Sequence, residues 1–192
     1  MRAAGVDVRE QPIKNLCVYT IGPRATDKTG YGSANAAAIS FDSTLKAVRV
    51  ACPAGGTTDS GPSIANALSS TSINALGPTT YTLGLDVTGE VADGWRISAQ
   101  GAWVSNKNIA SAYVPVPVGQ TVRIAFTFAT LGGTGAIYLL RQTSSIAGQV
   151  TIRNVMFEQS RIAHPFADGE SPGWQWLNTP GASTSVGYPR LA

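Results

Sequence analysis

The chain has 192 residues, of which 43% are hydrophobic and 13% are charged, and this length suffices to bury the core of one domain. Its net charge of +3 comes from scattered basic residues with no run of three, so nucleic-acid binding, which requires clustered basic charge, is not expected. We expect neither a secretory signal in residues 1–15 nor membrane insertion, since no stretch approaches about 18 apolar residues, and we expect folding in a cytoplasm.

The first part of the chain is predicted to contain a polar arm and a few short strands. Residues 1–14 are polar and aperiodic and are interpreted as an N-terminal arm. Residues 15–21 (NLCVYTI) are rich in β-branched and aromatic types, which favours a strand. A short hairpin is predicted over residues 36–41 and 45–52. Residues 63–75 are expected to be irregular or a weak strand, because their Ser/Thr cluster competes with helical hydrogen bonds.

From residue 79 onward the alternation typical of half-buried strands becomes regular. Residues 79–87 (TTYTLGLDV) and 121–128 (TVRIAFTF) each place every second, apolar residue on one face. Further strands are predicted at 94–98, 101–104, 109–117, 136–142 and 149–157, the last with an irregularity at Asn154. Pro115 and Pro117 place their segment at a sheet edge or a strand end, because proline lacks a ladder donor.

These elements predict an all-β fold, an antiparallel β-sandwich or jelly roll, because the strands are short, turn signals are frequent and helical periodicity is missing. The predicted organisation is an N-terminal arm (residues 1–14), the sandwich (residues 15–159) and an extended C-terminal docking segment (residues 160–192). We call residues 160–192 the C-terminal segment.

Two parts of the chain resemble known families. The pieces TYTLGLDV, GWRIS, TVRIAFTF and VTIRNVMFE resemble, in this order, the strands of carbohydrate-binding-module-like jelly rolls. The stretch HPFADGESPGWQWLNTPGASTSVG is similar to the C-terminal motif of minor tail proteins from phages of actinobacteria. The matching residues are Pro165, Phe166, Asp168, Gly169, Pro172, Trp176, Thr179, Pro180, Ala182, Ser183 and Ser185. Ala167 and Asn178 depart from that motif, and the first 75 residues carry no resemblance.

The resemblance implies a structural protein of a tailed-phage virion, most simply a minor tail or tail-tip protein that mediates assembly and host-surface adhesion. It implies other virion proteins and copies of the same chain as partners, and the virion as location. Two alternatives stay open: a capsid decoration protein of the phage head, and a module that binds host cell-wall glycan. The oligomeric state does not follow from the sequence.

An enzyme is not expected, and no catalytic residue is assigned. The single histidine, His164, has no nucleophile at a recognisable spacing, and Asp168 with Glu170 is interpreted as a turn. No cofactor and no metal site are expected, although a structural Ca²⁺ with Glu158 and Asn154 among its ligands stays open. Cys17 and Cys52 are predicted to be reduced, buried thiols, because two cysteines alone cannot form a zinc site.

The aromatic residues outside the regular core pattern supply the candidate binding sites. Exposed tryptophan and tyrosine rings stack on sugars, and a candidate glycan platform consists of Trp95, Trp103, Tyr113 and Tyr138. Both tryptophans lie on strand-like segments, which favours burial in the core over a place in this platform. A second set is predicted to dock the C-terminal segment on its own sandwich or on a neighbouring subunit: Phe166, Trp174, Trp176 and Pro180. Trp176 in particular is expected to be buried against protein.

Overall fold

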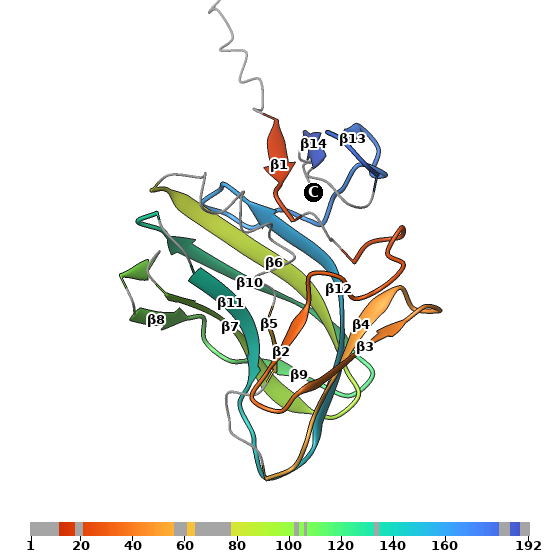
Figure 1. Cartoon of the computed structure of the whole chain (residues 1–192), viewed down its shortest axis with the longest axis vertical. Coiled ribbons are helices and arrows are strands. Elements are labelled where there is room, and N and C mark those ends of the chain that lie inside the picture. The colour runs from red at the N-terminus through yellow and green to blue at the C-terminus, as the bar shows by residue number, and fades with distance from the viewer. Residues whose placement is uncertain are drawn as a thin grey trace, which may run out of the picture.

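The computed structural model describes residues 12–17, 21–55, 61–63, 78–101, 104–105, 107–132, 135–180 and 185–188. These residues form strands and turns, arranged as two larger sheets and one small sheet (Figure 1). The described part of the chain contains no helix of the length and hydropathy that membrane crossing requires. The predicted all-β antiparallel fold is therefore confirmed. The predicted weak segment after Ser63 lies outside the described residues.

The five-stranded sheet is antiparallel throughout and has the order β10-β6-β12-β4-β3. Its strands are β3 (Ala38–Asp42), β4 (Ala47–Cys52), β6 (Thr80–Gly89), β10 (Thr121–Ala129) and β12 (Gly148–Glu158). The predicted hairpin is confirmed as β3–β4. Asp42 stabilises its turn, because Oδ1 accepts hydrogen bonds from the backbone N–H groups of Thr44 (3.0 Å) and Leu45 (2.9 Å).

The six-stranded sheet has the order β2-β5-β11-β7-β8, and its sixth strand, β9, also pairs with β7. Its strands are β2 (Gly32–Ala34), β5 (Gly61–Ser63), β7 (Asp93–Gly101), β8 (Lys107–Ala110), β9 (Val114–Val116) and β11 (Gly135–Arg141). The predicted edge position of Pro115 is confirmed, because β9 pairs with β7 alone among the described strands. The strand boundary predicted before Gly101 is wrong, since Gly101 ends a single long β7; Val104 has 3-10 helical conformation, and residues 102–103 lie outside the described residues.

The core between the two larger sheets follows the predicted alternation. Tyr81, Leu83, Leu85 and Val87 of β6 are at most 2% exposed. Their buried counterparts on β10 and β12 are Ile124, Phe128, Val150, Ile152, Val155 and Phe157. The rings of Tyr81 and Phe157 stack with centroids 5.2 Å apart. Both cysteines are free and buried, as predicted. Burial also raises the pKa of the Cys52 thiol, which keeps it protonated.

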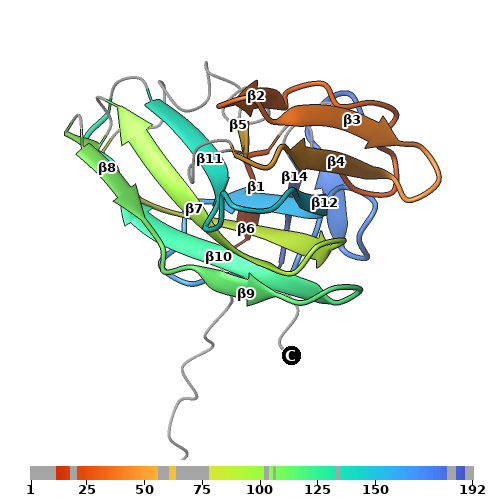
Figure 2. The ribbon, with the colours of Figure 1, turned by 90° about the horizontal axis from the view of Figure 1, so that it is seen from below.

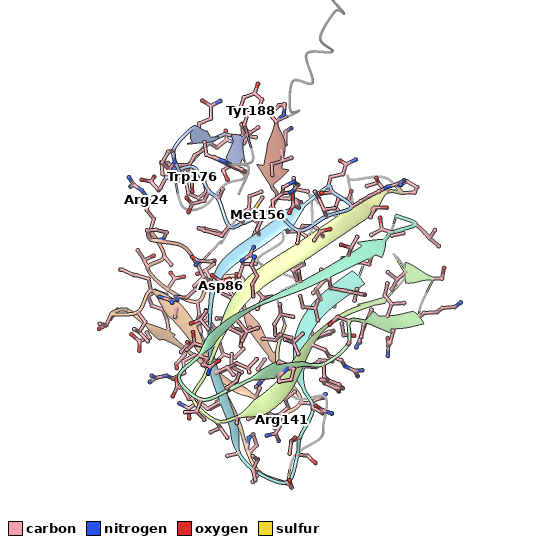
Figure 3. The ribbon with its side chains drawn as sticks, turned by 180° about the vertical axis from the view of Figure 1, so that it is seen from behind. Arg24, Asp86, Arg141, Met156, Trp176 and Tyr188 are labelled. Carbon is pink, nitrogen blue, oxygen red and sulfur yellow. The ribbon has the colours of Figure 1, made fainter. Side chains whose placement is uncertain are left out.

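A buried arginine closes one end of the core. Arg141 is fully buried and donates to the carbonyl oxygens of Ile146 (2.8 Å) and Pro53 (2.6 Å). Figure 3 places Arg141 at the end of the molecule opposite Tyr188. Figure 2 shows that β8 and the β3–β4 hairpin lie on opposite sides of the molecule. A guanidinium that satisfies two carbonyls in this way closes the core without leaving those acceptors unpaired.

A bulge in β12 confirms the irregularity predicted at Asn154. The register against β6 shifts between Arg153 and Met156, and Asn154 has a left-handed φ of 54°. The Asn154 backbone N–H donates to Ile21 O (3.0 Å), and its side-chain Nδ2 donates to Asp86 Oδ2 (2.7 Å). Because of the extra residue, Met156 and Glu158 come to lie on the outer face of the five-stranded sheet.

The two termini of the described chain meet in a small antiparallel sheet with the order β1-β14-β13 (Figure 1). Its strands are β1 (Ile13–Asn15), β13 (Trp174–Trp176) and β14 (Ser185–Gly187). The predicted boundaries are corrected here, because Ile13 and Lys14 belong to a strand rather than to an arm. Residues 1–11 of the predicted arm, and residues 18–20 of the strand predicted at 15–21, lie outside the described residues.

Asn15 connects this small sheet to the sandwich. Its side chain is fully buried, and Nδ2 donates to Val155 O (3.2 Å) and Ala167 O (3.0 Å). Its Oδ1 accepts the backbone N–H groups of Cys17 (3.1 Å) and Phe157 (3.0 Å). All four bonding positions of the amide are therefore used, which fixes β1 against β12 and the C-terminal segment.

Candidate functional site

The outer face of the six-stranded sheet, which points away from the core, combines polar and aromatic side chains. On β7, Trp95, Ile97 and Ala99 are buried in the core, so that Arg96, Ser98 and Gln100 point to the outer face. Across the ladder, Tyr138 of β11 lies opposite Ser98. Since its neighbours Ile137 and Leu139 point into the core, Tyr138 projects from the same outer face.

Tyr113 reaches this face from the other side of β7, out of the connection between β8 and β9. The Arg96 guanidinium lies over its ring, with Cζ 4.6 Å from the ring centroid, which is a cation–π contact. Between the two tyrosines, Gln100 Nε2 donates to Ser98 Oγ (3.3 Å). The structure thus brings two of the predicted platform residues, Tyr113 and Tyr138, to one face.

Trp95, one of the two tryptophans predicted for the platform, is not part of it. Trp95 is 0% exposed and belongs to the core, because the alternation of β7 turns it inward. We therefore correct its assignment: an indole without an exposed face cannot stack on a sugar. Trp103 lies outside the described residues. Sequence reasoning missed Arg96, although the same alternation in GWRIS that buries Trp95 and Ile97 identifies Arg96 as an outward side chain.

The C-terminal segment packs its two tryptophans onto glycines. The Trp174 indole lies on Gly187, where an added Cβ would come within 2.4 Å of the ring. Its Nε1 donates to Tyr188 O (3.1 Å), and the residue is only 8% exposed. The Trp176 indole lies on Gly169 in the same way, with a Cβ distance of 2.3 Å. Both rings are therefore held by close backbone approach.

Trp176 is half-buried, and its indole packs on Gly169 of its own segment. Its Nε1 donates to Glu170 Oε1 (3.0 Å), and Arg24 Nε lies 2.6 Å from the same oxygen. Figure 3 shows Arg24 and Trp176 side by side. The bond from Arg24, and then that from Trp176, lowers the pKa of the Glu170 carboxyl. Of the other predicted docking residues, Phe166 is half-buried and Pro180 is exposed.

A pocket of about 160 Å³ opens between β1 and the C-terminal segment. Its lining includes Ile13, Pro165, Phe166, Ser171, Pro172 and Trp174. We call it the terminal pocket. Sequence reasoning singled out Phe166 and Trp174 but could not place Ile13 beside them, because 152 positions separate Ile13 from Pro165 in the chain.

Glu158 and Asn154, the two residues named as candidate calcium ligands, both bond to other protein groups. Glu158 is 1% exposed, and its two carboxylate oxygens accept the backbone N–H (2.9 Å) and Nδ1 (2.5 Å) of His164. The Asn154 carbonyl accepts Arg123 Nη1 (3.1 Å), and its side chain is bonded to Asp86. Among the described residues, no group of three or more His, Cys, Asp or Glu side chains is placed to hold a metal ion. The side chains of Glu158 and Asn154 thus bond to protein groups in this structure.

No family model and no curated protein matches this chain. Solved structures do match. The CBM22-1 xylan-binding domain of Paenibacillus barcinonensis Xyn10C has a TM-score of 0.59 and 10% identity, over 79% of this chain and 96% of that domain. A CBM29-2 variant complexed with mannohexaose has a TM-score of 0.51 and 11% identity, over 80% and 94%. The comparisons give no support to the resemblance to phage minor tail proteins. They establish that this chain has the jelly-roll β-sandwich fold of carbohydrate-binding modules.

Proposed function

We propose that this chain is a non-catalytic carbohydrate-binding domain that binds glycan on the outer face of the six-stranded sheet. The observation that carries the proposal is the placement of Tyr113 and Tyr138 on either side of β7, with the half-buried Arg96 and Gln100 of β7 between the strands that carry them. Sugar sites combine aromatic faces with a few polar groups in this manner. The fold it shares with a xylan-binding domain supports the same proposal.

The geometry of this face favours an oligosaccharide over a single sugar. Arg96 covers one face of the Tyr113 ring and so fixes the orientation of that ring on the outer face of the sheet. The strands β9 and β11 lie on the two sides of β7, two strand spacings or about 10 Å apart. A single sugar ring cannot contact aromatic groups on both sides of β7, whereas a chain of several sugars can.

Titration with xylan, mannan and glucan oligosaccharides and with bacterial cell-wall polysaccharide tests the proposal. We expect Tyr113→Ala and Tyr138→Ala each to weaken binding by about tenfold, from lost stacking and lost apolar contact area. Tyr188→Ala is the matched control, because Tyr188 is 58% exposed and lies outside this face. Failure of every glycan to bind, or binding that both platform variants retain, would contradict the proposal.

The C-terminal motif is similar to that of minor tail proteins. From this similarity we propose a location for the binding domain, namely the surface of a tailed-phage virion. There it would contact other virion proteins, its own copies and host cell-wall glycan. Mass spectrometry of purified particles tests this part separately. Antibody labelling in electron micrographs then distinguishes a tail position from capsid decoration of the head. Particles that lack the chain would exclude the virion role and leave the glycan proposal unaffected.

A further inference from the structure

We propose that the terminal pocket binds a small quaternary ammonium group, such as the trimethylammonium of choline. This site is separate from the glycan face, because its lining comes from β1 and the C-terminal segment rather than from the six-stranded sheet. Three properties of the pocket carry the inference: its size and aromatic lining, a buried carboxylate behind its wall that has no ion-pair partner among the described residues, and the small number of acceptors on its lining side chains.

The size and lining of the pocket suit a compact, ring-sized cation. Its volume of about 160 Å³ is close to that of a cavity of about 150 Å³ known to accommodate benzene. Phe166 and Trp174 contribute aromatic rings, and cations gain electrostatic attraction from such rings. Trp174 is held in place, since its ring lies on Gly187 and its Nε1 donates to Tyr188 O. The aromatic lining is therefore formed before any ligand binds.

A buried carboxylate lies directly behind the pocket wall. Asp168 is 1% exposed, follows the lining residue Ala167, and its Oδ1 lies 3.4 Å from Oγ of the lining residue Ser171. Oδ1 also accepts the backbone N–H of Glu170 (3.0 Å), whereas Oδ2 is buried without a hydrogen-bond partner. Asp168 forms no ion pair with any described residue, since the nearby Arg24 is bonded to Glu170. A cation in the pocket would offset this buried negative charge.

The lining side chains of the pocket offer few acceptors to a primary ammonium, which favours a methylated cation. Of the described lining side chains, Ser171 alone carries a hydroxyl, and this hydroxyl already accepts Asp168 N (3.0 Å) and contacts Asp168 Oδ1. An ammonium group brings several N–H donors that need acceptors once they are buried, and leaving them unpaired is costly. A quaternary ammonium has no N–H group, so its burial in this pocket leaves no donor unsatisfied.

The test is an NMR titration that follows the Trp174 indole N–H resonance. The probes are tetramethylammonium, choline, 3,3-dimethylbutanol as the neutral isostere of choline, and ammonium, all at one ionic strength. We expect the two quaternary cations to bind on the order of tenfold more tightly than the neutral isostere, and ammonium not to bind. Equal affinity for choline and its neutral isostere, or no shift with either quaternary cation, would overturn the proposal.

Two variants separate the contributions of the ring and the charge. Phe166→Leu keeps an apolar lining but removes one aromatic face, and we expect several-fold weaker choline binding with unchanged binding of the neutral isostere. Asp168→Asn removes the charge and should lower the preference for choline over its neutral isostere. Asp27→Asn, which removes a carboxylate from an exposed loop, is the matched control and should leave that preference unchanged. If Asp168→Asn does not fold, Phe166→Leu decides: unchanged choline affinity in that variant contradicts the proposal.

The source of the cation and the independence of the two sites are tested in the same assay. Phosphocholine-bearing polysaccharide and phosphatidylcholine vesicles, added separately, distinguish a glycan source of the trimethylammonium group from a lipid one. Tyr138→Ala should leave choline binding unchanged, because Tyr138 lies on the six-stranded sheet and outside the terminal pocket. Loss of choline binding in Tyr138→Ala would contradict the assignment of the trimethylammonium group to this pocket.

Discussion

The side-chain amide of Asn15 donates to the backbone carbonyl of Ala167 at 3.0 Å, across 152 positions of the chain. The same buried side chain is bonded to Val155 and Phe157 of β12. One amide therefore joins the first described strand, the bulged strand of the sandwich and the C-terminal segment. Because the terminal pocket lies between β1 and the C-terminal segment, its shape depends on this junction.

Asn15→Ala should destabilise the fold by about 2–4 kcal/mol, because it leaves buried backbone donors and acceptors at Cys17, Val155 and Phe157 without their partner. Urea unfolding followed by tryptophan fluorescence measures the change. Lys14→Ala is the control on the same strand, and since Lys14 is exposed we expect a change within about 0.5 kcal/mol. Equal stabilities of the two variants would show that the junction contributes nothing.

Gly187→Ala should cost about 1–3 kcal/mol, because the new methyl group would lie 2.4 Å from the Trp174 ring and force the indole to move. Gly132→Ala is the control: Gly132 has a φ of 82° but open space around its Cβ position, so the cost there is one of backbone strain alone. Near-UV circular dichroism distinguishes the two, since only Gly187→Ala should change the tryptophan signal. An unchanged near-UV spectrum in Gly187→Ala would contradict the packing described here.

Asp168 should make the protein less stable as pH rises through the acidic range. Burial raises the pKa of its carboxyl in the folded state, an effect that its hydrogen bonds from Glu170 and Ser171 oppose. The folded state thus binds the proton more tightly than the unfolded state. Its contribution is complete below the unfolded pKa of about 3.9 and is lost as pH rises through the folded pKa. Stability curves for wild type and Asp168→Asn should converge at low pH and separate above it, and parallel curves would contradict this.

Asn154→Val should destabilise by about 1–3 kcal/mol, because a β-branched residue tolerates the left-handed backbone at this bulge poorly and the bond to Asp86 is lost. Asn154→Gly loses only the side-chain bond and accepts the backbone conformation, so the expected order of stability is wild type, then glycine, then valine. Thermal unfolding ranks the three proteins. A valine variant as stable as the glycine variant would mean that the backbone at the bulge carries no strain.

The strands of the sandwich could be predicted because the sequence pattern that specifies each strand lies within that strand. In β6, β10 and β12, alternate residues face the core, and the pattern of apolar and polar side chains states this directly. Asn154 interrupts that pattern, which is why the bulge was predicted as well. The boundaries of β7 were not, because Gly101 resembles a turn residue although it continues the strand opposite Gly135.

The small sheet and both candidate sites depend on contacts that no local pattern contains. Ile13 and Lys14 resemble a polar arm until β14 supplies their hydrogen-bonding partner. Trp95 resembles a sugar-stacking residue until the direction of β7 places it in the core. Conversely, Arg96 gains its role only because Tyr113, from a different segment, lies beneath its guanidinium. These outcomes depend on tertiary packing, which the pattern of a single sequence does not contain.

The register of β1 on β14 determines how the molecule responds to mechanical force. Ile13 pairs with Gly187 and Asn15 with Ser185, so the chain leaves both strands at the same end of the pair. Tension applied through residues 12 and 188 therefore peels the two strands apart one residue pair at a time, starting from Ile13, instead of shearing all three pairs together. We therefore expect the β1–β14 pair, which lies beside the terminal pocket, to separate at lower force than strands loaded in shear.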